Sequence, residues 1–515
     1  MNDLERKIRE NFKGVAVRKD LTAMMKKDVN VPTYVLEFLL GKYCVSDNEA
    51  DNVRGLEKVK KILNENYVRP DQSELIKSRI REKGSYQVID KVAVEYDDHA
   101  DVYVAKFSNL RIGPLEIAAD QVIHNEKLLV GGAWCFVELE YAPTEDDSET
   151  EYEEDIFGNR RKKKAVRKKK ARYDSTFSIH TLKLIQLQSF EPERMSGPRS
   201  CFAKDEWIDL LLLSIGYEPN EMETREKLHY LLRLVPFVQK NYNLVELGPR
   251  GTGKSHIYSE LSPYSILISS GQTTVSNMFY NMASKSVGLV GYWDCVAFDE
   301  VAGITRSSKE MVQIMKNYMA NGTFARGRES VTAGASICFE GNTFRSVADM
   351  LRKSTLFEPF PKDFNNDSAF FDRIHAYLPG WEMQKLRTSM FTARYGLISD
   401  MITEYCHAMR TYDFTDRFDA YYKLNKHFNT RDDIAVRRTF AGMAKLIYPN
   451  GEMSKEETRE LLEYAIEGRR RVKEQLQRMN PSEFGDVGLG FIDLETGQET
   501  VVVLPENTGI LNGAE

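Results

Sequence analysis

The chain has 515 residues, and its hydrophobic content of 42% supports roughly three or four packed domains and excludes a disordered chain. Lysine and arginine number 71 against 77 acidic residues, a net charge of -6, so any nucleic-acid site must be a local patch. The charged start MNDLERKIREN is no secretory signal, and no apolar run approaches the ~20 residues of a membrane span. We expect a soluble, cytoplasmic protein with no membrane partner.

The spacing of the cysteines and histidines argues against a zinc site. The six cysteines lie far apart with no C-x-x-C pair, and the eight histidines include no H-E-x-x-H motif. We therefore expect the cysteines to be reduced, as is usual for proteins of the cytoplasm.

Residues 1–80 carry apolar residues at helical spacing, for example in VPTYVLEFLLGKY and VRGLEKVKKILNENY, with a proline near the start of the first. Lysine and arginine are frequent between these apolar positions. A basic helical face is usually just solvated, but at an N-terminus it can also contact phosphate. The pattern predicts a helical N-terminal region, and both roles stay open for it.

From about residue 85 to 190 the hydrophobic pattern changes to period two, which is typical of strands. Turn residues separate five such segments: YQVIDKVAVEY, DVYVAKFSNL, LEIAADQVI, AWCFVELEYA and STFSIHTLKLIQLQ. Five strands fit a small Greek-key barrel of the OB type, although a sandwich would give the same alternation. We assign residues 81–195 to an OB-like β domain.

A charged insert, residues 143–174, lies between the last two strands of this domain. Eight acidic residues between Glu145 and Asp155 are followed by ten basic residues between Arg160 and Arg172. Each block repels itself and buries no apolar area, so we expect a flexible excursion. It is either a solvated hairpin neutralised by its own acidic half or a basic arm for nucleic acid.

Residues 196–395 follow the order of a doubly wound parallel sheet. A helical linker leads into short apolar strands that alternate with helical segments. Residues 396–480 are helical again, and residues 481–515 look like two strands that begin a further domain. The predicted fold class is multidomain α+β and α/β: a helical N-terminal region, an OB-like β-barrel, and a doubly wound parallel sheet with a helical lid.

The segment GPRGTGKS matches the phosphate-binding pattern G-x-x-x-x-G-K-[ST], between the apolar run LVEL and a helical segment. Its glycines let backbone N–H groups turn inward around phosphates, and the following helix adds its positive end. Lys254 would reach the outer phosphates and Ser255 would bind Mg2+. The predicted nucleotide-binding residues are Gly248, Pro249, Arg250, Gly251, Thr252, Gly253, Lys254, Ser255 and His256, and the predicted ligands are ATP and Mg2+.

A second apolar strand, in DCVAFDE, ends in two acidic residues. Asp299 would complete the Mg2+ shell, and Glu300 is placed to polarise the attacking water. By itself such a strand end is more often structural than catalytic. The phosphate-binding pattern upstream favours the catalytic interpretation.

A third strand, ASICFEGN, ends in Asn342, which is positioned to orient that water. With the helical segment after residue 395, this arrangement resembles the AAA+ ATPases. In that family two arginines complete the site, one from the neighbouring subunit and one from the lid. The resemblance assigns these roles to Arg373 in FFDRIHAYLPG and to Arg437, with Arg438 as its substitute. It implies an active site between subunits, and hence a homo-oligomeric closed ring, most simply a hexamer that could stack into a dodecamer.

Two short extended pieces, TFARG and SVTAGAS, precede the third strand and predict a hairpin that brackets Arg326 and Arg328. In the AAA+ branch of the minichromosome-maintenance helicases, Lon and magnesium chelatases, such a hairpin points into the central pore. Arginines there could grip a phosphate backbone. A solvated turn is the alternative.

A second candidate pore loop follows the second strand, with Gln272, Thr273 and Thr274 at its tip. These side chains could donate hydrogen bonds to phosphates without reading bases. Helix capping by Thr274 or Ser276 is the equally simple alternative.

The sequence closely resembles the BrxL family, the Lon-like AAA+ ATPases of bacterial BREX phage-exclusion systems. Among the longest segments that show the resemblance are LVPFVQKNYNLVELGPRGTGKSHIYSELSPYSIL and NMFYNMASKSVGLVGYWDCVAFDEVAGI. The resemblance spans about residues 30 to 480. It implies a ring ATPase that binds double-stranded DNA through an N-terminal DNA-engaging region, residues 1–80, and acts in antiviral defence with other BREX components.

The chain departs from that family at its end. Family members usually continue into a Lon-protease-like domain, and after residue 480 this chain has one serine, Ser482, and no lysine. We therefore expect no protease activity, with residues 481–515 the start of a truncated or absent Lon-like domain.

Three functions remain open at this point. The first is a DNA-binding motor in which Lys254, Asp299, Glu300 and Arg373 of a neighbouring subunit hydrolyse ATP. The second is a protein unfoldase that feeds a separate protease, although the pore loop lacks the aromatic residue usual there. The third is a scaffold that nucleotide binding switches without much turnover.

Overall fold

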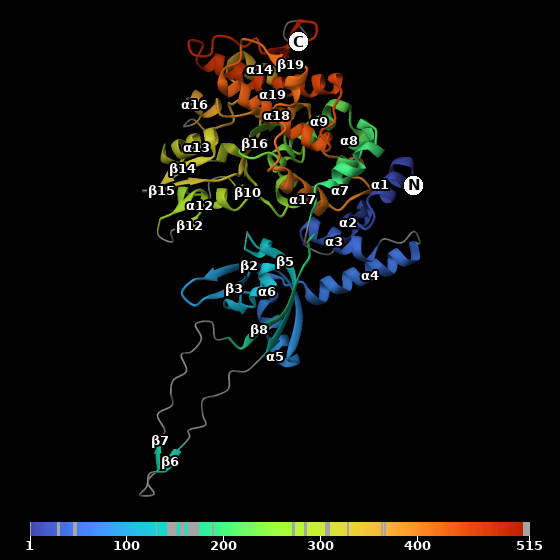
Figure 1. Ribbon diagram of the computed structural model, residues 1–515, viewed down its shortest axis with the longest axis vertical. Coiled ribbons are helices and arrows are strands. Elements are labelled where there is room, and N and C mark those ends of the chain that lie inside the picture. Colours follow the sequence, from blue (N-terminus) through green and yellow to red (C-terminus); the bar gives the residue numbers. More distant parts are fainter. Residues whose placement is uncertain are drawn as a thin grey trace. The chain divides into compact units, whose positions relative to one another are not determined.

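The structure is a computed structural model that describes residues 2–27, 31–44, 49–129, 131–141, 152–154, 160–162, 175–187, 190–269, 273–282, 286–303, 309–326, 329–361, 364 and 367–507. The chain divides into two compact units (Figure 1). One joins Met1–Asp47 to Ser189–Glu515, and the other is Asn48–Gln188. This division differs from the predicted boundaries, because the N-terminal region expected over residues 1–80 is split between the units.

The first 47 residues belong to the larger unit. They form α1 (Asp3–Asn11), β1 (Ala16–Arg18), α2 (Lys19–Lys26) and α3 (Thr33–Tyr43). Strand β1 pairs antiparallel with β18 (Tyr395–Leu397). The buried ammonium of Lys19 donates to Glu37, at 2.8 Å, and to the carbonyls of Ser214 and Leu397. These long-range contacts anchor the segment.

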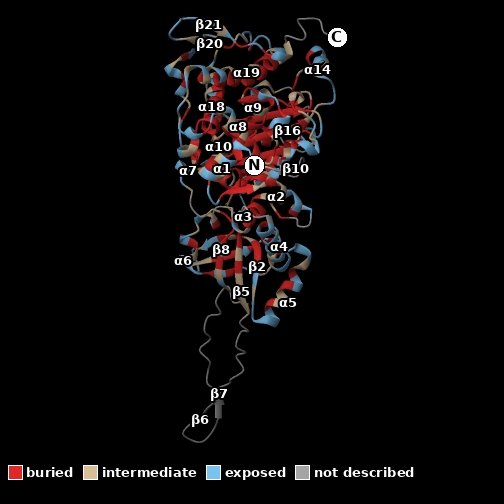
Figure 2. Ribbon diagram, turned by 90° about the vertical axis from the view of Figure 1, so that its right-hand side faces the viewer, coloured by how far each residue is buried: buried red, intermediate tan, exposed pale blue. Residues whose placement is uncertain are grey.

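The smaller unit opens with the helices α4 (Glu49–Asn66) and α5 (Ser73–Lys83). Its sheet contains β2 (Ser85–Asp97), β3 (Val102–Phe107), β4 (Leu115–Ile117), β5 (Ala133–Tyr141) and β8 (Phe177–Leu184). The order is β4-β3-β2-β5-β8, with every neighbouring pair antiparallel. Alternating residues of these strands form the core of the unit, as the red segments of Figure 2 show.

One predicted strand of this unit is only half a strand. The segment LEIAADQVI forms β4 over its first residues and then the short helix α6 (Ala119–Ile123). The prediction of a strand through residue 123 is therefore wrong. Over so short a segment the apolar positions fit the period of a helix as well as that of a strand. The helix buries Val122, so the apolar side chain is accommodated equally well.

The charged insert contains a two-stranded antiparallel pair, β6 (Tyr152–Glu154) and β7 (Arg160–Lys162). The register places an acidic strand beside a basic one, with Glu153 opposite Arg161 and Glu154 opposite Arg160. This pairing agrees with the hairpin interpretation of the insert. The other residues of 143–174, and with them the predicted flexibility, lie outside the described part of the chain.

The larger unit is built on five parallel strands: β9 (Asn243–Gly248), β10 (Ser265–Ser269), β13 (Cys295–Asp299), β16 (Ser336–Asn342) and β17 (Ala376–Pro379). Their order is β10-β13-β16-β9-β17, which confirms the predicted parallel sheet. The connecting helices are α11 (Lys254–His256), α12 (Val275–Met278), α13 (Lys309–Asn321), α14 (Val347–Lys353) and α16 (Ser368–Phe371). Strand β9 is buried along its whole length, so it delivers the following loop from the centre of the unit.

Helices complete the larger unit before and after the sheet. They are α7 (Glu193–Ser196), α8 (Lys204–Ser214), α9 (Thr224–Leu232), α10 (Val235–Val238), α17 (Ser399–Met409), α18 (Thr430–Ile447) and α19 (Lys455–Met479). The last strands, β20 (Gly490–Asp493) and β21 (Glu499–Val501), form a sheet with β19 (Tyr422–Leu424). They were expected to begin a separate domain, but pairing with β19 makes them part of this unit. In the described part of the chain, every helix is too short or too polar to cross a bilayer.

Candidate nucleotide-binding site

The loop GPRGTGKS leaves the carboxyl end of β9 and turns sharply into α11. Gly251 and Gly253 adopt positive φ angles of 84° and 74°, a conformation that costs other residues free energy. Gly248 lies so close to Gly380 that a Cβ atom on it would stand 2.4 Å from the Gly380 carbonyl carbon. The loop therefore has the tight, glycine-dependent geometry that exposes backbone N–H groups to phosphates.

One polar side chain of the loop contacts the end of the acidic strand. Ser255 Oγ donates a hydrogen bond to Asp299 Oδ1 at 3.1 Å. Lys254 Nζ donates to the carbonyl of Pro249 at 2.8 Å, which curls the ammonium over the loop. Burial lowers the pKa of Lys254. A hydroxyl and a carboxylate at this separation are the hard oxygen ligands that Mg2+ prefers, so the residues fit the predicted metal.

The positions of Glu300 and Asn342 are set by the strands that precede them. Asp299 ends β13, and Glu300 comes next with a φ angle of 53°, unusual for a residue other than glycine. Asn342 ends β16 directly opposite Gly248 on the neighbouring strand. Because parallel strands end at one edge of the sheet, Asp299, Glu300 and Asn342 gather beside the loop.

A buried cluster of charged residues, which was not predicted from the sequence, lies beneath the loop. Glu340, on β16, is 1% exposed. Burial, and then the neighbouring carboxylate of Glu246, raises its pKa to about 8. Arg233 binds Glu246 at 2.6 and 2.9 Å and donates to the carbonyl of Thr252 in the loop. An acidic residue inside the apolar run SICFEGN was the available signal.

Arg373 follows α16 at the far end of β17 from the loop. Its Nη1 donates to the carbonyl of Ala369, and its Nε makes no hydrogen bond with any described residue. The structure therefore does not bring Arg373 to the nucleotide loop of its own chain.

Arg437 lies on α18 and is surrounded by carboxylates of its own chain. Its guanidinium binds Asp416, Asp419 and Asp433 at 2.8 to 3.1 Å. The substitute, Arg438, donates to the carbonyl of Asn241 and contacts His375. Neither arginine contacts the GPRGTGKS loop in this chain.

The predicted hairpin before the third strand is confirmed. Strand β14 (Thr323–Arg326) pairs antiparallel with β15 (Glu329–Thr332), and Arg326 stands opposite Glu329 in the register. Arg328 and the Arg326 side chain lie outside the described atoms.

The second candidate pore loop precedes α12. Thr274 caps this helix, because its hydroxyl accepts a hydrogen bond from the backbone N–H of Asn277 at 3.2 Å. The capping alternative is therefore observed. Thr273 accepts a hydrogen bond from the side chain of Asn277, and Gln272 lies outside the described residues.

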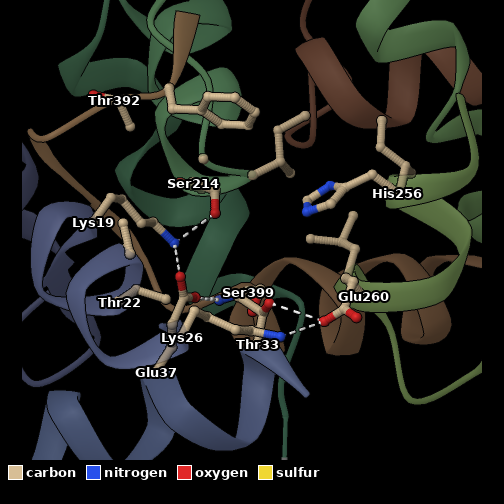
Figure 3. Close-up of a pocket in the computed structure, with 16 residues that line it drawn as sticks. Lys19, Thr22, Lys26, Thr33, Glu37, Ser214, His256, Glu260, Thr392 and Ser399 are labelled. Carbon is tan, nitrogen blue, oxygen red and sulfur yellow. Dashed lines mark hydrogen bonds and ion pairs between the residues drawn. The ribbon is translucent and has the colours of Figure 1, made fainter. Parts of the chain in front are cut away.

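A cavity of about 440 Å³ opens beside α11 (Figure 3). His256, the last of the predicted nucleotide-binding residues, directs its imidazole ring into it. The other walls come from α2, α3, the end of α8, the residues after α11 and the segment around β18. One lining residue of the cavity, His256, therefore directly follows Ser255, the last residue of the phosphate-binding loop.

Comparisons with known proteins identify the family. The family described as "Lon-like protease BrxL-like, ATPase domain" matches residues 177–490, and "BREX system Lon protease-like protein BrxL N-terminal" matches residues 10–141. A Lon-like protease BrxL from Bacillus cereus (strain H3081.97) is 50% identical over 99% of this chain and 72% of its own length. Another, from Escherichia coli O9:H4 (strain HS), is 50% identical over 98% of this chain and 69% of its own.

Among solved structures, the full-length MCM homolog from Methanopyrus kandleri is similar over 74% of this chain and 76% of its own, at 12% identity and a TM-score of 0.38. The sequence relatives, each half identical over nearly the whole chain, carry the assignment. The chain therefore belongs to the BrxL family and contains the ATPase domain of that family.

Proposed function

We propose that this protein is a ring-forming AAA+ ATPase that binds double-stranded DNA and couples ATP hydrolysis to DNA engagement or translocation in bacterial BREX antiviral defence. The observation that carries the proposal is the contact between Ser255 and Asp299 beside Lys254, in a chain of the BrxL family. It joins the phosphate-binding loop to the acidic strand, which is what nucleotide hydrolysis requires.

Each site residue then has a definite task. The loop N–H groups bind the phosphates of ATP, and Lys254 leaves the carbonyl of Pro249 for the outer phosphates. Ser255 and Asp299 hold Mg2+, which neutralises charge on the phosphates when bound. Glu300 accepts a proton from the attacking water, and Asn342 orients that water.

The site is completed by a neighbouring subunit. Arg373 reaches the γ-phosphate bound to the next chain, where its charge stabilises the transition state. Arg437 leaves the three carboxylates that it binds in its own chain and binds a phosphate instead. The unpartnered Nε of Arg373 supports the first assignment. A hexameric ring, stacked into a dodecamer in one arrangement, would place each arginine in this way.

DNA is held by the smaller unit and by the pore hairpin. The strand order β4-β3-β2-β5-β8, with α6 between β4 and β5 and with β4 close to β8, supports an OB-like barrel. Because Met1–Asp47 belongs to the larger unit, we place the DNA-engaging region in Asn48–Gln188. We assign the contacts with the phosphate backbone to the residues predicted for the pore, which are Arg326, Arg328, Gln272, Thr273 and Thr274.

The decisive experiment compares ATP hydrolysis with and without double-stranded DNA in the wild type and in Glu300→Gln. We expect DNA to change the wild-type rate, and the variant to bind ATP and DNA but to hydrolyse about 100-fold more slowly. An ATPase that ignores DNA but unfolds a reporter protein would instead indicate an unfoldase. Full BREX function in Glu300→Gln would indicate a nucleotide-switched scaffold.

DNA contact itself is tested through salt. The affinity for DNA falls steeply as the salt concentration rises when it depends on phosphate contacts. In a plot of the logarithm of the binding constant against the logarithm of the salt concentration, the double variant Arg326→Ala/Arg328→Ala should reduce the magnitude of the slope by up to about two. Thr332→Ala, at the base of the same hairpin, is the matched control. An unchanged affinity and slope in the double variant would remove the hairpin from the DNA site.

A further inference from the structure

Carbonyl groups of the phosphate-binding loop accept hydrogen bonds from donors that lie outside the loop. Two of these donors are backbone N–H groups, that of Thr343, which donates to Gly248 at 3.1 Å, and that of Leu386, which donates to Gly251 at 2.8 Å. The third donor is a side chain, because Nη2 of Arg233 donates to the carbonyl of Thr252 at 3.1 Å. Contacts with three distant segments of the chain therefore set the direction of these peptide groups.

The contact with Arg233 decides which way the next backbone N–H group points. The C=O and N–H of a trans peptide unit point in opposite directions, and the described part of the chain contains no cis peptide bond. Because the carbonyl of Thr252 points to Arg233, the N–H of Gly253 points to the opposite face of the loop. That face is the one on which the proposed function places the phosphates.

The guanidinium group of Arg233 is held in a single orientation. Arg233 is 0% exposed and binds the carboxylate of Glu246 through Nε at 2.9 Å and through Nη2 at 2.6 Å. Its Cζ atom lies 4.9 Å from the centre of the Tyr230 ring. Nη2 carries two hydrogens, so one serves Glu246 and the other serves Thr252. A lysine ammonium has no such planar fork and cannot reproduce this set of contacts.

We propose that Arg233 is a positioning residue for phosphate binding: through the carbonyl of Thr252 it turns the N–H of Gly253 toward the phosphates of ATP, and Glu246 holds Arg233 in place for this task. The inference rests on the proposed binding of ATP to the loop. Because Arg233 acts on the backbone of the loop, its loss weakens every ligand that carries the same phosphate chain, with or without a nucleoside.

The first test removes the contact without leaving a buried charge. The double variant Arg233→Met/Glu246→Met replaces the ion pair with apolar side chains, a change that folded proteins often tolerate. We expect it to keep a cooperative thermal transition and to bind both Mg-ATP and inorganic triphosphate at least about tenfold more weakly. The matched control, Lys19→Met/Glu37→Met, removes another buried pair whose cation also donates to carbonyls, and it should bind both ligands with wild-type affinity.

A second variant, Arg233→Lys, keeps the buried charge beside Glu246 but loses the fork. We expect the KM for ATP to rise about threefold to tenfold while kcat changes by less than about twofold, since the ground state and the transition state lose the same phosphate contact. A purely structural role of Arg233 would lower the thermal transition and leave the KM of the folded protein unchanged.

Wild-type affinity for inorganic triphosphate in the folded double variant, or an unchanged KM in Arg233→Lys, would overturn the proposal. If the double variant loses its thermal transition, the KM of Arg233→Lys decides alone. Failure of the proposed function looks different, because then the wild type binds neither ligand, or Lys254→Ala leaves both affinities intact, and the role of Arg233 falls with it.

Discussion

Glu340 lies in a row of three carboxylates on neighbouring parallel strands. It faces Glu246 on β9, and on β13 the pair Phe298–Phe339 places Asp299 next to it at the following position. Arg233 neutralises Glu246, and Ser255 donates to Asp299. The carboxyl group of Glu340 therefore has acidic neighbours on both sides and keeps its proton. A neutral acid here adds no negative charge beside the predicted metal ligands Ser255 and Asp299.

Replacing Glu340 changes how stability depends on pH. Because burial raises the pKa to about 8, the folded state holds a proton from about pH 4.5 to 8 that the unfolded chain has lost. The free energy of unfolding should therefore fall, relative to that of Glu340→Gln, by up to about 1.4 kcal/mol for each pH unit in this range. Denaturant titrations at pH 5, 6 and 7 without Mg2+ measure it, with Glu452→Gln as the exposed control. A pH-independent difference would contradict the prediction.

The backbone of Gly380 leaves no room for a Cβ atom at position 248. An alanine there would collide with the backbone of Gly380, which cannot yield as a flexible side chain could. We expect Gly248→Ala to cost about 1–3 kcal/mol of stability and to displace the loop, with a loss of ATP affinity. Gly197→Ala, where no atom lies within 4 Å of the new Cβ, should change neither. Thermal unfolding and ATP titration of the two variants decide the point.

Among the elements, helix α19 fixes the segment that carries Arg373. Arg469, fully buried on α19, donates to the carbonyls of Asp372 and Ile374, the two residues that flank Arg373. It also binds the carboxylates of Asp372, at 2.6 Å, and Asp432 on α18, at 2.8 Å. One side chain thus joins two helices to the end of α16. The orientation of Arg373 depends on this joint.

Loss of the Arg469 contacts should lower the free energy of unfolding substantially. Arg469→Met leaves two buried carboxylates with one fewer cation and two carbonyls without a donor, so we expect a loss of about 3–5 kcal/mol. Arg459→Met removes an exposed pair with Glu463 on the same helix and should cost no more than about 0.5 kcal/mol. Denaturant unfolding measures both. Similar losses in the two variants would show that Arg469 has no special structural role.

At the scale of the whole molecule, the chain builds the larger unit from two separated segments. It begins in that unit, forms the smaller unit over Asn48–Gln188, and returns at Ser189. Each unit has its own hydrophobic core, one around the parallel sheet and one around the antiparallel sheet. Units with separate cores are expected to unfold separately.

Calorimetry tests this independence. Asp90 in the smaller unit accepts hydrogen bonds from the backbone N–H groups of Lys91, Asn109 and Leu110, so Asp90→Ala leaves buried donors unpaired. We expect it to lower one transition by roughly 5–10 °C and to leave the other unchanged. Arg469→Met should shift only the second transition. A single transition that both variants move would contradict two independent units.

Much of the candidate site could be predicted because its signals are local. The conformation of GPRGTGKS depends on glycines within eight residues, and Asp299, Glu300 and Asn342 end apolar strands that a short window reveals. Glu340 was missed because its environment depends on strand order. Its neighbours are Glu246 and Asp299, and neither is near it in the chain.

The sequence by itself determined the phosphate-binding loop, the alternation of strands and helices, the hairpin before β16 and the family, because each depends on neighbouring residues or on long matching strings. Only the tertiary structure decided that residues 1–47 join the larger unit and line a cavity beside the loop. The reason is that Lys19 finds its acceptors at Ser214 and Leu397, about 200 and 400 positions away. Contacts of that range follow from which segments meet on folding, and no short pattern records them.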